Sequence, residues 1–354
     1  MVGDLGAKPA GSPPVYAALD LGTNNCRLLV AKPTSNSPTS NGFEVVDSFS
    51  RIIRLGEGVS ETGRLSSAAM DRAISALEVC AHKMVINGVT RARLIATEAC
   101  RQAANSEDFI AKVKHSTGLT IEIIDQKTEA DLAVAGCASL IDKNSDYVLI
   151  FDIGGGSSEL IWLDVKQIRS EQQEALSTNP WGNNQAIIAW DSFPVGVVTL
   201  AEKFGGKAVT QQSYDRMVGY VKGLLEGFAE QIEGKLRLSQ GRTHYLGTSG
   251  TVTTLAGVHL KLDYYDRQKI DGIWMNIDEV GSISQQLINL THEERSDIPS
   301  IGPERADLVL GGCAILRAML EIWPTEKLRV ADRGLREGIL HRLMAEDGEL
   351  EQNQ

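Results

Sequence analysis

Two segments that share one order of residue types constrain the fold of this chain more than any other feature. Each begins with an apolar run that reads as a buried strand, Val15 to Asp20 (VYAALD) and Tyr147 to Asp152 (YVLIFD). Each run ends on an aspartate, passes through a glycine turn and continues into a second strand. A strand–turn–strand unit that occurs twice, each time ahead of alternating strands and helices, predicts an internal duplication with two similar halves.

Hydrophobic periodicity predicts the rest of each half. Further strands complete a meander of three, and strands then alternate with helices. The elements expected in the first half are strands at 26–31, 43–49, 93–96 and 120–124, with helices at 66–86, 106–116 and 128–141. Those expected in the second half are strands at 159–163, 185–190, 244–246 and 328–330, with helices at 252–260 and 333–344. This order predicts an α/β protein with a mixed sheet and helices in each half.

The length of the chain agrees with two cores. Its 354 residues exceed the roughly 250–300 at which single cores stop growing. Residues 1–14 read as a disordered tail of Gly, Ala, Pro and Ser without the apolar core of a secretory signal, and 347–354 as a second tail. No apolar run approaches the roughly 20 residues that cross a bilayer. We therefore expect a cytoplasmic protein with no membrane partner.

Charge and cysteine content exclude several classes of site. The net charge of −11 argues against a nucleic-acid partner, which would require a basic face. A phosphate site in such a chain must be locally rich in N–H donors or include a metal ion. The five scattered cysteines form no Cys-x-x-Cys pair, which favours small buried hydrophobes over a disulfide framework or structural zinc.

The glycine turns are suited to binding phosphate. Glycine lets the backbone approach a ligand closely, and successive N–H groups in a turn form a concavity for an anion. Hydroxyl and amide side chains add donors, and the aspartates could hold a hydrated cation or orient water. The candidates in the first turn are Asp20, Gly22, Thr23, Asn24 and Asn25. Those in the second are Asp152, Gly154, Gly155, Gly156, Ser157, Ser158 and Glu159.

A tight β-hairpin would explain the first turn by itself, whereas three consecutive glycines indicate the close approach of a ligand. A third turn, Gly247, Thr248, Ser249 and Gly250, follows a strand and precedes a helix, where phosphate groups bind readily. A helix cap accounts for Thr248 or Ser249 but not for both glycines. The first and second turns each stand at the head of one of the two similar halves. Together they predict a paired phosphate clamp.

The three turns resemble the phosphate and nucleotide motifs of the actin, heat-shock chaperone and sugar kinase superfamily. More narrowly, the chain resembles the exopolyphosphatase/guanosine pentaphosphate phosphatase family. Residues 96–105 (ATEACRQAAN) are similar to its Thr-x-Ala-x-Arg-x-Ala-x-Asn motif, and TEA at 128–130 stands at its Glu-Glu-Ala. Residues 328–340 resemble its Ser-x-x-Gly-(Leu/Val)-Arg-Glu-Gly end. The resemblance covers about 15–344, nearly the whole chain.

This resemblance implies two ribonuclease-H-like, actin-like lobes, each a mixed sheet with helices, and a cleft between them. The first lobe would span 15–127 plus 331–346, and the second 128–330. The chain lacks the additional C-terminal helical domain and His-Asp motif of longer family members, so it resembles the short form. A homodimer is expected by resemblance only.

The resemblance also implies roles for individual residues. Glu129 matches the general base that activates the attacking water, and Glu159 matches a carboxylate that positions water or metal. Arg101 would reach phosphate oxygens with its bidentate fork. Asp152 and Glu159 would hold Mg²⁺, the expected cofactor, because hard oxygen ligands and phosphate suit it. Without the resemblance, Glu129 reads as a solvated acid in the first turn of a helix, and Arg101 as a surface arginine in a salt bridge.

The expected activity is that of an exopolyphosphatase that releases terminal orthophosphate from inorganic polyphosphate, with short chains favoured. A guanosine pentaphosphate 5'-phosphohydrolase of the stringent response remains open, as does a non-catalytic polyphosphate or nucleotide sensor. The chain departs from the family in having Thr128 for the first Glu of Glu-Glu-Ala, with Asp125-Gln126-Lys127 ahead of it. These departures leave the base intact and bear on substrate preference. Segment 171–185 has no predicted role.

Two other classes remain as alternatives. An ATP-driven chaperone module would require a peptide-binding domain and gives Glu129 no role. A sugar kinase could use Asp152 but leaves Glu159 and Arg101 unexplained.

Overall fold

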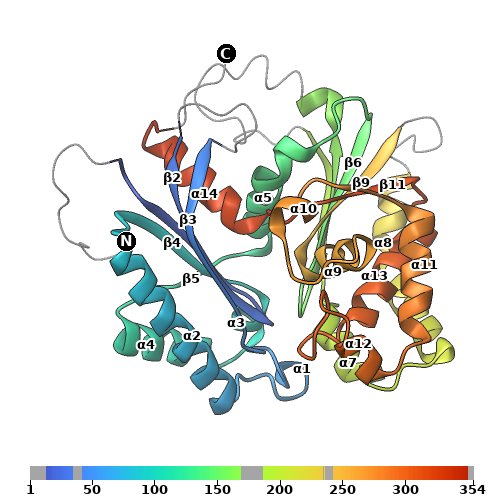
Figure 1. The fold of residues 1–354 in the computed structure, drawn as a ribbon, viewed down its shortest axis with the longest axis horizontal. Coiled ribbons are helices and arrows are strands. Elements are labelled where there is room, and N and C mark those ends of the chain that lie inside the picture. The colour runs from blue at the N-terminus through green and yellow to red at the C-terminus, as the bar shows by residue number, and fades with distance from the viewer. Residues whose placement is uncertain (1–12, 35–41, 169–185, 234, 236–241, 350–354) are drawn as a thin grey trace. The chain divides into compact units, whose positions relative to one another are not determined.

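The computed structural model describes residues 13–34, 42–168, 186–233, 235 and 242–349 (Figure 1). The expected segment at 171–185, most of the expected N-terminal tail and residues 350–354 lie outside the described residues. The chain divides into two compact units, Met1–Ser139 with Gly334–Gln354 (unit 1) and Leu140–Arg333 (unit 2). We describe each unit by itself.

Unit 1 contains a mixed five-stranded sheet in the order β3-β2-β1-β4-β5. Strands β1, β2 and β3 form an antiparallel meander, while β4 and β5 add in parallel to β1. The bounds of these strands are β1 Tyr16–Leu21, β2 Asn25–Pro33, β3 Phe43–Ile52, β4 Arg91–Ala96 and β5 Glu122–Ile123. The antiparallel meander places the first glycine turn between β1 and β2, at the edge where the parallel strand β4 also ends.

Both faces of the sheet are buried at strand β1, because its side chains alternate between two cores. Ala17 and Leu19 belong to a cluster with residues of helix α2, whereas Tyr16 and Ala18 pack with residues of α5 and α14. The helices of unit 1 are α1 Val59–Thr62, α2 Ser67–Ile86, α3 Glu98–Gln102, α4 Ser106–Thr117, α5 Gln126–Cys137 and α14 Leu335–Glu346. In Figure 1, α14 runs beside α5 although the two are far apart in sequence.

Helices α5 and α14 approach each other closely because glycines face the opposite backbone. A Cβ at Gly338 would collide with the Leu132 carbonyl, and one at Gly136 with the Gly334 carbonyl. Helix α5 therefore belongs to unit 1, and the unit ends after it, at Ser139. The boundary expected at 127/128 would cut the chain inside the first turn of this helix, whereas the observed boundary lies between Ser139 and Leu140.

Unit 2 repeats the strand order of unit 1. Its six-stranded sheet has the order β10-β11-β9-β6-β7-β8, in which β6, β7 and β8 form the antiparallel meander and β9 and β11 add in parallel. The bounds are β6 Tyr147–Ile153, β7 Ser158–Asp164, β8 Ile187–Phe193, β9 Thr243–Thr248, β10 Trp274–Asn276 and β11 Lys327–Val330. Read from the meander outward, the sheets match strand for strand, and β10 is an additional antiparallel edge. The expected duplication is therefore present in the fold.

The helices of unit 2 pack with its sheet around one large core. They are α7 Val197–Phe204, α8 Gln211–Glu233, α9 Ser249–His259, α10 Arg267–Ile270, α11 Ile277–Ile288, α12 His292–Ser296 and α13 Val309–Ile322. None of the helices in the described part of the chain has the length and apolar character that a membrane crossing requires.

The expected fold class, α/β with a mixed sheet and helices in each half, is confirmed. The five cysteines are buried, as expected for small hydrophobes. Several elements were not among those expected, including the short helices α1 and α3 and the edge strand β10. Helix α3 holds Arg101, which therefore lies on a short helix that follows β4.

Candidate active site

The first glycine turn is fixed by backbone bonds to the segment after β3. The N–H of Gly22 donates to the Asn25 carbonyl (2.9 Å), which closes the turn. The Asn24 carbonyl accepts from Ile53 N (2.8 Å). The Thr23 carbonyl accepts from Gly56 N (2.9 Å), and a Cβ at residue 56 would collide with the Thr23 methyl group. The turn is held rigidly, and the N–H of Gly22, a predicted phosphate donor, is already used inside it.

The amide side chains of this turn have unused hydrogen-bonding capacity. The Oδ1 atoms of Asn24 and Asn25 are buried, and no hydrogen-bond partner is found for either among the described residues. A buried polar atom without a partner costs about 1–3 kcal/mol, so it is retained where a ligand completes the bond. Because an amide oxygen accepts, a bound water or a ligand hydroxyl would complete these bonds, while the predicted contacts to phosphate oxygens would use the Nδ2 groups of Asn24 and Asn25.

Helix α3 begins beside the first turn because β4, the strand that precedes it, pairs with β1. Leu21 at the end of β1 pairs with Ala96 at the end of β4, and Thr97 N donates to the Leu21 carbonyl (3.3 Å). Arg101 on α3 therefore lies at the same end of the sheet as the turn that follows Asp20.

Arg101 joins Glu129 in a partly buried ion pair. Its Nη1 lies 2.7 Å from Glu129 Oε2 and donates to the Ile124 carbonyl (2.9 Å). The two side chains are 16% and 14% exposed. Its Nε and Nη2 both donate to Glu98 Oε2, at 2.9 and 2.7 Å. Burial works against the charge of Arg101, but Glu129 and Glu98 together raise the pKa of its guanidinium. Without the resemblance, Arg101 was expected to be a surface arginine in a salt bridge. It does form salt bridges, but it is largely buried.

Glu129 stands in the first turn of α5, where the sequence placed it. Asp125 caps the helix by accepting from Thr128 N (2.7 Å), which fixes where the first turn begins. Unit 1 thus brings together the first glycine turn, Arg101 and Glu129.

In unit 2, the second glycine turn places two carboxylates on one face of the sheet. Asp152 on β6 is the direct cross-strand partner of Glu159 on β7, so their side chains project to the same side. Glu159 is 3% exposed, and Ser192 on β8 donates its hydroxyl to Glu159 Oε1 (2.8 Å). This bond from β8 holds the Glu159 carboxylate in place on the face that it shares with Asp152.

The backbone of the second turn is anchored by helix α7. The N–H of Val197 donates to the Gly154 carbonyl (3.0 Å), and that of Val198 donates to the Gly155 carbonyl (2.9 Å). Gly154 N donates to the Ser157 carbonyl (2.9 Å), as Gly22 N does in the first turn. Among the described residues, the N–H groups of Gly155 and Gly156 donate to no backbone carbonyl. These two groups are the anion donors that the turn offers.

The two serines after the glycines are buried, and one of them already has an acceptor. The hydroxyl of Ser158 donates to the Val195 carbonyl (2.6 Å), and the residue is 1% exposed. In this structure Ser158 fastens the turn to the segment before α7. Ser157, which is 4% exposed, remains a candidate donor.

The third turn lies beside the second because β9 is the parallel neighbour of β6. Thr248 pairs with Asp152, and its hydroxyl donates to the Phe151 carbonyl (3.3 Å). Gly247 has no room for a Cβ, which would collide with the Phe151 ring and Val252. Ser249 opens helix α9 with a φ of 87°, a strained value for a residue with a side chain. Its Oγ is buried, and the described residues provide no hydrogen-bond partner for it.

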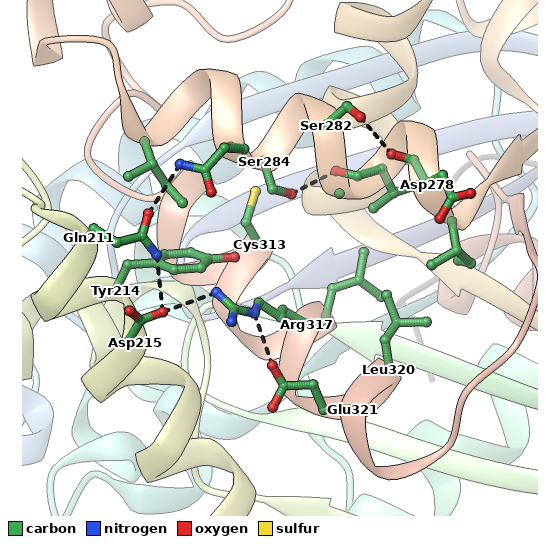
Figure 2. Close-up of a pocket in the computed structure, with 16 residues that line it drawn as sticks. Gln211, Tyr214, Asp215, Asp278, Ser282, Ser284, Cys313, Arg317, Leu320 and Glu321 are labelled. Carbon is green, nitrogen blue, oxygen red and sulfur yellow. Dashed lines mark hydrogen bonds and ion pairs between the residues drawn. The ribbon is translucent and has the colours of Figure 1, made fainter.

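A groove elsewhere in unit 2 is lined by none of the predicted site residues (Figure 2). It lies between α8, α11 and α13 and has a volume of about 740 Å³. Its arginine, Arg317, is paired with Asp215 and Glu321 at 3.0 Å each, and Asp278 adds a further acid. A groove with this balance of charge is unsuited to a phosphate-rich ligand.

Three residues that shape the two clusters were missed from the sequence. They are Glu98, which binds Arg101, Ser192, which binds Glu159, and Gly196, which packs on the second turn. Glu98 lies within the recognised segment 96–105 and could have been noted there. Ser192 and Gly196 contact the turn from a distant part of the chain, and no local pattern marks them.

Comparison with known proteins identifies relatives of the whole chain. The model of the Ppx/GppA phosphatase family matches residues 30–347. A guanosine-5'-triphosphate,3'-diphosphate pyrophosphatase of Photobacterium profundum is 27% identical over 94% of this chain and 60% of its own length. Exopolyphosphatase 2 of Mycobacterium tuberculosis is 27% identical over 91% of this chain and 96% of its own length. The chain thus spans about three-fifths of the first relative and nearly all of the second.

Solved structures share the fold along nearly the whole chain. A Ppx/GppA family member from Aquifex aeolicus is 26% identical with a TM-score of 0.72, covering 95% of this chain and 99% of the other. An exopolyphosphatase from Cytophaga hutchinsonii gives a TM-score of 0.78 at 23% identity, covering 96% of this chain and 100% of the other. The second likeness concerns the fold alone.

Proposed function

The chain belongs to the Ppx/GppA phosphatase family, as its motifs predicted, and we propose that it hydrolyses phosphoanhydride bonds, releasing terminal orthophosphate from inorganic polyphosphate. Short chains are the favoured substrate. A relative that matches over nearly its whole length carries the name exopolyphosphatase, which supports this choice.

The observation that carries the proposal is the pair of Arg101 and Glu129 at 2.7 Å, at the end of the sheet where the first glycine turn lies. Phosphoryl transfer to water requires a carboxylate that orients the water, with donors and cations around the phosphate. Glu129, held by Arg101, has the chemistry of this base. The glycine turns and Asn24 and Asn25 supply donors to phosphate oxygens.

Mg²⁺ is part of the proposal, and the donor set of unit 2 suits it. Among the described residues no three His, Cys, Asp or Glu side chains gather as a metal cluster. Mg²⁺ is commonly bound by one or two carboxylates together with substrate phosphates, and Asp152 and Glu159 form such a pair on one face of the sheet. Bound there, the ion would neutralise charge on the phosphate.

A second candidate is the hydrolysis of guanosine pentaphosphate in the stringent response, which the name of the Photobacterium relative favours. The reacting bond is the same kind of phosphoanhydride, so the residues proposed above serve either substrate. Retention of the site without hydrolysis, as in a polyphosphate sensor, is the third candidate.

The decisive experiment compares phosphate release from short polyphosphate, long polyphosphate and guanosine pentaphosphate in the presence of Mg²⁺. Glu129→Gln should lower release by about 10²–10⁴-fold, since a general base contributes that much. Glu107→Gln is the matched control, because Glu107 is likewise a first-turn glutamate, on α4. Equal activity of the two variants would remove Glu129 from the mechanism. Binding of polyphosphate without release by the wild type would favour the sensor.

The assembly and location of the protein are proposals as well. We expect a cytoplasmic homodimer that binds neither nucleic acid nor membranes. Nucleic-acid binding is not expected because the net charge is −11. Sedimentation of the purified protein, with and without DNA, tests the oligomeric state and the absence of nucleic-acid binding.

A further inference from the structure

Glu98 is a buried carboxylate of unit 1 for which the proposed reaction has no role. It is 7% exposed and stands at the start of the short helix α3. Both of its oxygens are occupied. Oε2 accepts from Arg101 Nε (2.9 Å) and Nη2 (2.7 Å), and Oε1 accepts from Gln102 Nε2 (2.6 Å). A buried charge held on both oxygens is fixed in position.

The contacts of Arg101 divide between the two edges of its guanidinium group. Glu98 binds the edge formed by Nε and Nη2, while Nη1 is directed at Glu129 Oε2 and the Ile124 carbonyl. Because the guanidinium is planar and rigid, fixing one edge fixes the direction of the other. Glu98 and Glu129 also pair with the same positive charge. The negative charge of each therefore offsets part of the attraction that Arg101 exerts on the other.

We propose that Glu98 is a positioning residue for the reaction: by holding Arg101 it aims Nη1 at the Glu129 carboxylate and moderates the charge that acts on this base. The inference rests on the proposed function, in which Glu129 is the general base. If Arg101 paired with Glu129 alone, its positive charge would stabilise the ionised carboxylate more strongly and make Glu129 a weaker base. Glu98 thereby keeps Glu129 oriented without suppressing its basicity.

Other charged groups surround α5, and among the described residues none of them is a hydrogen-bond partner of Glu98, whose bonds go to Arg101 and Gln102. On α5 itself, Asp125 caps the helix, and Lys127 pairs with Asp131 (2.9 Å). On α14, which packs against α5, Arg336 lies next to Glu337, and the Glu337 carboxylate accepts from Gly334 N (2.8 Å). A titration shift at Glu129 in a residue-98 variant therefore reports the loss of Glu98.

The variant Glu98→Gln keeps the shape and removes the charge. We expect kcat to fall about tenfold with KM within about twofold of wild type, a part of the 10²–10⁴ that a base contributes. The acid limb of the kcat/KM profile should move to lower pH by about half to one unit, since a nearby like charge is lost. Glu98→Asp, which keeps the charge, should leave the limb in place while lowering kcat.

Glu122→Gln is the control, because Glu122 forms a similar fork with Arg93 (3.1 Å to both Nε and Nη2) but is 55% exposed. It should leave both kcat and the acid limb unchanged. A limb that stays at the wild-type pH in Glu98→Gln, with kcat lowered or not, overturns the proposal. Should Glu98→Gln fail to fold, a limb in Glu98→Asp that moves as far as one unit overturns it instead.

A measurement without turnover separates this proposal from the proposed function. The pKa of Glu129 is followed by NMR in protein labelled with ¹³C at glutamate carboxyls, and its signal is assigned by its loss in Glu129→Gln. A lower Glu129 pKa in Glu98→Gln than in the wild type supports the coupling, and an unchanged one overturns it, even if no substrate is hydrolysed. Absence of phosphate release by the wild type would overturn the proposed function instead.

Discussion

Gly196 packs directly against the Gly155 carbonyl, with no room for a Cβ atom between them. This contact joins the start of α7 to the second glycine turn, which also receives the N–H groups of Val197 and Val198. The shape of a proposed phosphate site is thus set by a residue that carries no functional group.

Gly196→Ala should displace the second turn. We expect a loss of about 1–3 kcal/mol in the free energy of unfolding, as for other overpacked sites, and a fall in phosphate release. The control is Gly219→Ala on α8, where a Cβ would meet nothing within 4 Å. That change should stabilise the helix by about 0.5–1 kcal/mol. Urea unfolding and phosphate release measure both, and equal stability of the two variants would contradict the packing argument.

Removal of divalent cations by a chelator should abolish phosphate release, and added Mg²⁺ should restore it. Asp152→Asn should raise the Mg²⁺ concentration needed for half-maximal release by about tenfold or more, since Mg²⁺ depends on few carboxylate ligands. Asp164→Asn serves as the control, because Asp164 lies at the other end of the β6–β7 pair. An unchanged Mg²⁺ requirement in Asp152→Asn would exclude this residue as a ligand.

The free energy of unfolding should fall between about pH 6.5 and pH 4, because His244 is protonated more readily in the unfolded chain. Burial lowers the pKa of His244 from 6.5 to about 4, and its Nδ1 lies 3.0 Å from Ser145 Oγ. A depressed pKa means that the unfolded chain binds the proton more readily, so the neutral side chain stabilises the fold fully above pH 6.5. The loss at pH 4 is on the order of 3 kcal/mol. Urea unfolding at several pH values should show this slope, and His244→Gln should flatten it.

Tyr16→Phe should weaken unit 1. The Tyr16 hydroxyl, on the first strand of the chain, donates to Asp347 Oδ2 (2.7 Å) at the end of α14. Its loss should cost about 1.5–3 kcal/mol, because a hydrogen bond to a charged group is removed. Tyr264→Phe, at a residue that is 68% exposed, should have an effect below about 0.5 kcal/mol. Indistinguishable urea midpoints for the two variants would count against this contact.

The sequence predicted those parts of the fold that local pattern determines. Strands β1 and β6 were recognisable because apolar runs end on Asp20 and Asp152 ahead of glycine turns. The helix at Ser67–Ile86 was also predicted, and in the structure Ser66 caps it by accepting from Ala69 N. Helix α3 was missed because its five residues are too few to show a helical period.

The candidate site was predictable in its residue types and less so in its contacts. Arg101 was expected to bind phosphate, whereas its hydrogen bonds in this structure go to Glu98, Glu129 and Ile124. Gly154 N donates within its own turn, and the Ser158 hydroxyl donates to the Val195 carbonyl. Both hydrogen bonds depend on backbone geometry that residue types do not encode. The position of α5 in unit 1 follows from glycine contacts with α14, which are distant in sequence.

The return of α14 to unit 1 has a consequence for the order in which the protein is made. Unit 2 is continuous, Leu140–Arg333, while unit 1 is completed only by Gly334–Gln354. Because chains fold as they are synthesised from the N-terminus, unit 2 is complete on the ribosome before unit 1 has its last helix. Until then the face of β1 that carries Tyr16 and Ala18 lacks the cover of Leu340 and Met344. The unit that is begun first is therefore finished last, and a chain released early would expose this strand to aggregation.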